Sequence, residues 1–352
     1  MRAVDGDCRV NGVSRARVIT DVADGRDTRG PVPIRGTFHG LVGRSPLMLR
    51  VFDQIRGLAA GSAPVLIVGE TGTGKDLIAR AIHDGSARRA DPYVVVNCAA
   101  LPRELIESEL FGYVRGAFSG AHAEHPGLFR AAAGGTVLLD ELTEMSPELQ
   151  AKLLRVTQER RVRPVGSVTE VPVDVRFIAS TNRDVDAALR AGVLRADLYY
   201  RLSVGMIAVP PLRERRDDIP LLVEHHLEAL NERYGGTVAR VRSIERDALD
   251  ALVQCPWPGN IRELFNVLER AYTARPSLHI RLDDLTLPAS AAEPAAPAPE
   301  LQRTPRTTTY EEIERALIRR TLGSTGGNKA RAARQLGISR KRLYARIAKY
   351  DL

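Results

Sequence analysis

The stretch that decides the fold is VLIVGETGTGKDLIARAIH, residues 65–83. It opens with four apolar residues typical of a buried strand, passes through a glycine-rich segment and continues as a helical run from Leu77 to His83. Glycines let the backbone close around phosphate oxygens, and the start of a helix offers unpaired N–H groups to an anion. The strand–loop–helix order predicts a nucleotide-binding loop rather than an ordinary turn, formed by Gly69, Glu70, Thr71, Gly72, Thr73, Gly74, Lys75 and Asp76.

Within this loop, Lys75 is expected to neutralise the β and γ phosphates. The generic motif continues with Ser or Thr, whose hydroxyl ligates Mg²⁺, but this chain has Asp76. A carboxylate is also a hard oxygen ligand, so the metal can still be held directly or through water. The metal site is therefore predicted to be altered rather than lost.

A second motif, GGTVLLDE at residues 134–141, reads as an apolar strand that ends in two acids. Alone, such a pair is more often a solvated strand end than a catalytic one. Together with the upstream loop it predicts separate roles, in which Asp140 holds Mg²⁺ and Glu141 polarises the attacking water.

The wider pattern predicts an α/β fold with a parallel sheet flanked by helices. Short β-rich runs at Val65–Val68, Tyr93–Asn97, Thr136–Asp140 and Val175–Ser180 alternate with helical patterns, and the chain becomes helical after Pro211. We expect five regions: a flexible leader (1–37), an α/β subdomain (38–211), a helical lid (212–287), an Ala/Pro-rich linker (288–306) and a small all-helical domain (307–352).

Composition limits the class of protein. The 352 residues are 44% apolar, yet no apolar run reaches the roughly 18 residues that a membrane span requires. The first residues include Asp5 and Asp7 rather than a signal-peptide pattern, and Cys8, Cys98 and Cys255 are too far apart in sequence for a disulfide framework. These features predict a cytoplasmic protein without membrane association.

Positive charge is concentrated at the C-terminus. Residues 301–352 hold 13 Lys and Arg against 4 Asp and Glu, whereas the first 300 residues hold 38 against 39. A solvated basic tail or basic interaction module is one interpretation, and a nucleic-acid footprint is the other. Helical runs at 310–322, 328–336 and 339–350 are separated by glycines. They place the apolar residues where a helix-turn-helix needs its core, namely Ala332, Ala333, Leu336, Ile338, Leu343 and Ile347.

The pattern therefore favours DNA binding. The last helix is expected to expose Arg340, Lys341, Arg342 and Arg346. Arg340 and Arg342 are the candidate base readers, because residues near a helix N-terminus reach deepest into the major groove. Lys329 and Arg331 are expected to contact phosphates, which position the protein without specifying sequence.

Three further strings carry a resemblance: ELFGYVRGAFSGA (109–121), ADLYYRLSVGMIAVPPLRERRDDIP (196–220) and WPGNIREL (257–264). They resemble the AAA+ central domain of sigma-54-dependent transcriptional activators, the bacterial enhancer-binding proteins, over about residues 38–287. The C-terminal unit resembles the Fis-type helix-turn-helix domain of that family. The resemblance implies ATP and Mg²⁺ as cofactors. It also implies a homo-oligomer, from dimer to hexamer, that binds enhancer DNA and the sigma-54 RNA polymerase holoenzyme.

The resemblance also implies roles for single residues. Asn97 would couple Glu141 to a loop that contacts sigma-54, and that loop is Gly116, Ala117, Phe118, Ser119, Gly120 and Ala121. Asn182 would sense the γ-phosphate, Arg195 and Arg201 would reach a neighbouring subunit's nucleotide, and Arg262 would be the second sensor. Arg213 would border the adenine.

Two functional alternatives stay open from the sequence. One is a DNA-binding regulator that keeps the AAA+ fold but has lost sigma-54 coupling, and the other is an AAA+ remodeller of another substrate. Ser119, where the family has Thr, and Asp76 keep the first alternative open. The 37 residues of the leader are too few for the large N-terminal regulatory domain that many relatives carry.

Overall fold

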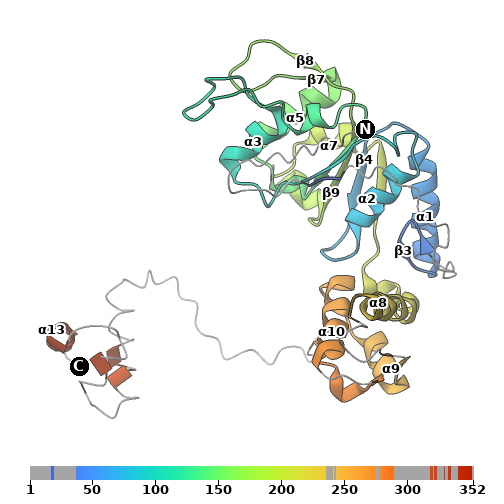
Figure 1. Cartoon of the computed structure of the whole chain (residues 1–352), viewed down its shortest axis with the longest axis vertical. Helices are drawn as coiled ribbons and strands as arrows, with labels where there is room; N and C mark the ends of the chain where they lie inside the picture. The colour runs from blue at the N-terminus through green and yellow to red at the C-terminus, as the bar shows by residue number, and fades with distance from the viewer. Residues whose placement is uncertain are drawn as a thin grey trace, which may run out of the picture. The chain divides into compact units, whose positions relative to one another are not determined.

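The computed structural model describes residues 17–19, 37–234, 241, 243–274, 278–288, 318–319, 321–322, 329, 332–333 and 340–350 (Figure 1). The chain forms two compact units, Met1–Ser290 and Ala291–Leu352. Each unit is held by its own clusters of buried apolar side chains.

A six-stranded sheet in the order β1-β5-β6-β9-β4-β10 organises the first unit. Its five parallel strands are β4 (Val65–Val68), β5 (Tyr93–Asn97), β6 (Thr136–Asp140), β9 (Arg176–Thr181) and β10 (Gly205–Ala208). The register pairs Asn97 with Asp140 and Val68 with Thr181. Because the strands are parallel, their carboxyl-terminal residues lie side by side at the same end of the strands.

The α/β class and the parallel sheet predicted from the sequence are confirmed. β4, β5 and β6 have the predicted bounds, and β9 begins and ends one residue later than expected. Strand β10 was not predicted, because it lies at the sheet edge and alternates buried with exposed residues. It therefore lacks the continuous apolar run of a strand buried on both faces.

The region expected to be a leader, residues 1–37, contains one strand that the sequence did not predict. Strand β1 (Arg17–Ile19) pairs antiparallel with β5, so that Val18 lies opposite Val94. Three residues are too few to show a period of two, which is why the sequence pattern did not reveal this strand.

Helices cover both faces of the sheet. Alternate strand residues enter different cores: Val65 and Ile67 pack with α1 (Pro46–Ala59) and α2 (Lys75–Asp84), whereas Leu66 belongs to the opposite core. The second core includes side chains from α3 (Arg103–Phe111), α4 (Leu128–Ala131), α5 (Pro147–Glu159), α6 (Val185–Arg190) and α7 (Ala196–Leu202). Two short hairpins, β2–β3 (Thr37–Phe38, Leu41–Val42) and β7–β8 (Arg161–Val162, Val171–Pro172), and the turn η1 (Leu142–Glu144) complete this part.

A helical lid follows the sheet. It contains α8 (Ile219–Tyr234), α9 (Arg246–Gln254) and α10 (Asn260–Ala274), which pack around the buried side chains of Trp257 and Tyr272. Short elements join them: η2 (Leu212–Glu214), η3 (Arg216–Asp218), β11 (Ser243–Ile244), β12 (His279–Ile280) and η4 (Leu282–Asp284). The lid is not entirely helical as expected, because Ser243–Ile244 pairs with β12 and α9 begins only at Arg246.

In the second unit, α13 (Arg340–Tyr350) is the last helix. Ala332, Ala333, Leu343 and Ile347 are buried in one cluster with Ile318 and Tyr350, as the helix-turn-helix pattern predicted for the first four. The predicted core residues Leu336 and Ile338 lie outside the described residues. No helix in the described part of the chain is long and apolar enough to cross a membrane.

Candidate active site

The glycine-rich loop connects the end of β4 to the start of α2. Gly72 and Gly74 have φ values of +79° and +97°, a left-handed conformation that side-chain-bearing residues rarely adopt. A Cβ on Gly72 would also lie 2.3 Å from the carbonyl oxygen of Gly259 in the lid. Glycine is therefore required at position 72 both by its backbone conformation and by the close approach of the lid.

Lys75 is the central cation of this loop. Its buried Nζ donates hydrogen bonds to the carbonyl oxygens of Gly69 at 2.9 Å and Glu70 at 3.2 Å. The same Nζ lies 3.9 Å from Glu141 Oε1. Burial lowers the pKa of Lys75 and raises the pKa of Glu141, while the attraction between the two groups opposes both shifts.

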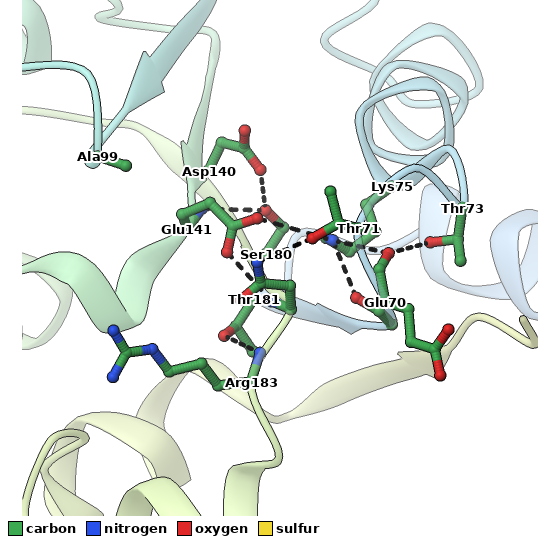
Figure 2. Close-up of polar contacts among 12 residues, drawn as sticks. Glu70, Thr71, Thr73, Lys75, Ala99, Asp140, Glu141, Ser180, Thr181 and Arg183 are labelled. Carbon is green, nitrogen blue, oxygen red and sulfur yellow. Dashed lines mark hydrogen bonds and ion pairs between the residues drawn. The ribbon is translucent and has the colours of Figure 1, made fainter. Parts of the chain in front are cut away.

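The two acids, Asp140 and Glu141, lie at the end of β6, beside the end of β9 (Figure 2). The Ser180 hydroxyl donates a hydrogen bond to Asp140 Oδ1. Glu141 has a left-handed backbone conformation with φ +56°, and its Oε2 accepts a hydrogen bond of 3.1 Å from the Asn182 backbone N–H. The Asn182 side-chain amide donates to the Thr71 hydroxyl at 3.0 Å. The first sensor predicted from the resemblance therefore lies between Glu141 and the glycine-rich loop.

Asn97, which the resemblance predicts to couple Glu141 to the sigma-54-contacting loop, lies against Asp140 in the structure. Its Nδ2 is 3.4 Å from Asp140 Oδ2, and its Oδ1 accepts hydrogen bonds from the backbone N–H groups of Ala99 and Ala100. The reason is the sheet register, which places Asn97 directly opposite Asp140.

These elements surround a cavity of about 90 Å³. Its lining combines the glycine-rich loop, the end of β6 and one lid residue: Thr71, Gly72, Gly74, Lys75, Asp76, Asp140, Glu141 and Arg262. Arg262, which sequence reasoning named as the second sensor, thus lies at the same cavity although almost 190 residues separate it from the loop.

The donor set of the cavity fits Mg²⁺. Asp76 and Asp140 both line it, and Mg²⁺ is usually held by one or two carboxylates together with phosphate oxygens and water. Among the described residues, no group of three or more His, Cys, Asp and Glu side chains could form an all-protein metal cage. A metal here would therefore take its remaining ligands from water or from phosphate oxygens.

The lid also contacts the glycine-rich loop directly, which sequence reasoning missed. Arg213 forms an ion pair with Glu70 through both Nη atoms, at 2.7 and 2.8 Å, and lowers the pKa of Glu70. The structure thus places the Arg213 side chain against the glycine-rich loop, and its expected place beside the adenine stays a prediction. Asn260 donates a hydrogen bond to the Thr71 carbonyl oxygen at 3.0 Å. The PPLRER and WPGN strings contained these residues, but their partners lie 143 and 189 positions away.

Arg195 and Arg201 do not line this cavity. Arg195 precedes α7 and binds Asp197 through Nε at 3.1 Å and Nη2 at 2.7 Å. Arg201 donates from Nε and Nη2 to the Thr157 carbonyl oxygen. Both guanidinium groups are therefore bonded to residues of α5 and α7.

The GAFSGA loop, residues 116–121, presents an aromatic ring. Phe118 is 44% exposed and its ring centroid lies 5.0 Å from that of Tyr113, so it is not buried in the core. The chain just before this loop is bonded to the β7–β8 hairpin, because the Val114 N–H donates to the Val165 carbonyl oxygen at 3.1 Å. A Cβ on Gly166 would lie 2.8 Å from Ala117 Cβ. The two loops therefore pack closely against each other.

In the second unit, Arg340 and Lys329 are exposed and Arg346 is half-buried near the Tyr350 hydroxyl. Lys329 Nζ lies 5.3 Å from the ring centroid of Tyr344. Lys341 and Arg342 belong to α13, but their side chains lie outside the described part of the chain, as does Arg331.

The parallel sheet, the glycine-rich loop, the acidic pair and the helical lid together define an AAA+ P-loop NTPase fold. The chain matches the sigma-54 interaction domain over residues 41–208, the AAA+ ATPase lid domain over 213–302 and the bacterial regulatory protein Fis family over 309–350. It belongs to the family of sigma-54-dependent transcriptional regulators.

Individual relatives support this assignment. The transcriptional regulatory protein ZraR of Escherichia coli K12 is 47% identical over 311 residues, which cover 88% of this chain and 68% of ZraR. The response regulator PilR of Pseudomonas aeruginosa is 46% identical over 315 residues, covering 89% and 70%. The crystal structure of NtrX from Brucella abortus in complex with ATP aligns with a TM-score of 0.64 and 34% identity, covering 89% of this chain and 69% of NtrX.

Proposed function

We propose that this chain is an ATP-dependent transcriptional activator. In this proposal it binds enhancer DNA, assembles into a ring, and uses ATP hydrolysis to convert the closed sigma-54 RNA polymerase complex to the open complex. The observation that carries the proposal is the cavity lined by Lys75, Glu141 and Arg262, in the same chain as an exposed Phe118 on the GAFSGA loop. The ATP and ADP complexes of the relative NtrX support nucleotide binding at the corresponding fold.

We assign the work to the regions expected from the sequence. Residues 38–211 would hold and cleave the nucleotide, 212–287 would form the lid, and 307–352 would bind DNA. Residues 1–37 and 288–306 would be a leader and a linker. The boundary between the two compact units, at Ser290 and Ala291, agrees with a linker in this part of the chain.

The chemistry would rest on the groups that line the cavity. The backbone N–H groups of residues 69–76 and Lys75 would bind the ATP phosphates. Asp140 and Asp76 would hold Mg²⁺, which would neutralise charge on the phosphates. Glu141 would orient and accept a proton from the attacking water, and the raised pKa of its carboxyl favours proton acceptance. The Asn182 N–H holds that carboxylate in place.

Hydrolysis would need a neighbouring subunit. Arg195 and Arg201 do not line the cavity of their own chain, and in this proposal they complete the site of the adjacent copy. A guanidinium supplied in this way increases turnover by roughly 10³- to 10⁵-fold in comparable enzymes. ATP turnover per chain should therefore rise steeply with protein concentration.

The test is transcription in vitro from a supercoiled sigma-54 promoter. The wild-type chain with ATP should produce open complexes. Phe118→Ala should hydrolyse ATP but produce no open complexes, whereas Glu141→Gln should bind ATP and produce neither hydrolysis nor open complexes. Open complexes formed by either variant at the wild-type level, or formed with a non-hydrolysable ATP analogue, would refute the proposal. ATP hydrolysis without activation by the wild-type chain would instead favour a remodeller of another substrate.

A further inference from the structure

The lid contacts four consecutive residues of the glycine-rich loop. Arg213 binds the Glu70 carboxylate through two hydrogen bonds. The next three residues each offer their backbone carbonyl oxygen to a lid donor at 3.0 Å: Thr71 O to Asn260 Nδ2, Gly72 O to the Ile261 N–H, and Thr73 O to Arg215 Nη2. Residues 70–73 of the loop are therefore all hydrogen-bonded to the lid.

Two of these donors are buried and have several partners. Asn260 is fully buried, has a left-handed backbone with φ +53°, and also donates to Glu70 Oε2 at 3.1 Å while accepting from the Leu212 N–H at 2.8 Å. Arg215 is 2% exposed and its second Nη lies 2.9 Å from Met48 Sδ. Because buried polar groups are costly when they lose their partners, these contacts fix one arrangement of lid and loop.

The geometry has a consequence for phosphate binding. The C=O and N–H of one trans peptide group point in opposite directions. When the lid takes the carbonyl oxygens of Thr71, Gly72 and Thr73, the N–H groups of the same three peptides face away from the lid donors. Those are the N–H groups of residues 72–74, which belong to the set that a nucleotide loop offers to phosphate oxygens.

We propose that Arg213, Arg215 and Asn260 are positioning residues that couple the lid to the shape of the phosphate loop. The inference rests on the proposed function, because it requires that the loop binds nucleotide. It differs from the role of Arg262, which lines the cavity itself. By linkage, a nucleotide that stabilises this loop shape must also stabilise the lid arrangement, and the lid must raise nucleotide affinity by the same factor.

The first test is a double-mutant cycle on nucleotide affinity. ADP binding to the full chain is measured for wild type, Glu70→Gln, Arg213→Met and the double variant. Each single substitution should weaken ADP binding by about three- to tenfold. The double variant should bind ADP as tightly as the single variant with the lower affinity, because both substitutions remove the same contact. The matched control is Arg233→Met, because Arg233 is an exposed lid arginine that contacts Glu269 within the lid, and it should leave ADP affinity unchanged.

The second test separates a positioning role from a merely structural one. Asn260→Asp keeps the shape and tolerates the left-handed backbone, but it removes the amide donor. It should raise the KM for ATP at least about fivefold and leave kcat within about twofold, because a loop that binds substrate and transition state equally affects binding alone. Arg215→Lys, which keeps a donor, should have a smaller effect than Arg215→Met, and melting curves should show that all variants are folded.

The outcomes distinguish this inference from the proposed function. Additive effects in the cycle, or variants that fold and bind ADP like wild type, would overturn the coupling and leave ATP-driven activation intact. A folded wild-type chain that binds neither ADP nor ATP would refute the proposed function and the coupling together. A fall in kcat at unchanged KM would assign these residues to the chemical step and would also overturn the inference.

Discussion

At the scale of single residues, the candidate site depends on groups whose protonation is shifted by burial. Glu141 and Lys75 lie 3.9 Å apart, and each is partly removed from water. Burial disfavours the charged form, so the pKa of Glu141 is raised above its ordinary 4.5 and the pKa of Lys75 is lowered below its ordinary 10.5. Both charged forms are the ones that the proposed mechanism needs.

The pH dependence of ATP turnover follows from these directions. Glu141 must be deprotonated to accept a proton, so kcat/KM for ATP should fall at low pH through a group that titrates above 4.5. Lys75 must be protonated, so kcat/KM should fall at high pH through a group that titrates below 10.5. The active pH range should be narrower on both sides than ordinary side chains would give. The measurement is kcat/KM for ATP against pH, because this ratio reports the groups of the free enzyme. The control is Glu107→Gln, which removes a surface partner of Lys152 and should leave the acid and alkaline limbs of the pH profile unchanged. An acid limb at the ordinary carboxyl pKa in the wild-type chain would contradict the role of Glu141.

The sequence predicted which residues line the cavity better than it predicted how they contact one another. Lys75, Asp140, Glu141 and Arg262 are brought together as their motifs indicated. The contact of Asn97 with Asp140 depends on strand register, and the contact of Arg213 with Glu70 joins residues 143 positions apart. Local patterns contain no information about such pairings, because the pairings arise only when the sheet and the lid have folded.

At the scale of elements, the sheet was predictable where strands are buried and not where they lie at an edge. β4, β5 and β6 are continuous apolar runs, whereas β10 alternates and β1 has three residues. The GAFSGA loop and the β7–β8 hairpin show a further contact between elements. The chain around residue 113 pairs with both His125 and Val165, which links the GAFSGA loop to the β7–β8 hairpin.

We expect this link to matter for sigma-54 remodelling and not for ATP turnover. In Gly166→Ala, the new Cβ would lie 2.8 Å from Ala117 Cβ, so the GAFSGA loop must shift. Open-complex formation should fall at least about fivefold, while ATP turnover stays within about twofold. The control is Gly40→Ala. Gly40 and Gly166 both have φ +78°, so the backbone strain is the same, but a Cβ on Gly40 would meet no atom within 4 Å. If both variants activate transcription equally well, the contact between the two loops has no role in activation.

At the scale of the whole molecule, charge and cores divide the chain in the same way. The first unit carries the sheet and lid cores, and the first 300 residues are nearly neutral with 38 basic and 39 acidic side chains. The second unit has a separate small core and 13 basic residues against 4 acidic ones from residue 301 onward. Nucleotide chemistry and DNA binding should therefore be separable by substitution.

The basic residues of the second unit should divide further into base readers and phosphate contacts. Arg340 is exposed at the start of α13, where a recognition helix reaches base edges, so Arg340→Ala should weaken binding to the enhancer by about 5- to 150-fold and leave non-specific binding nearly unchanged. Lys329→Ala should instead weaken both kinds of binding equally and reduce the dependence of log K on log salt concentration by about one phosphate contact.

The measurement is binding to enhancer DNA and to unrelated duplex DNA across a range of salt concentrations. The control is Arg319→Ala, because Arg319 is an exposed arginine of the same unit. ATP turnover should remain at the wild-type level in all three variants. If Arg340→Ala lowered enhancer and unrelated DNA binding by the same factor, Arg340 would be a phosphate contact and the basis of sequence recognition would lie elsewhere in the unit.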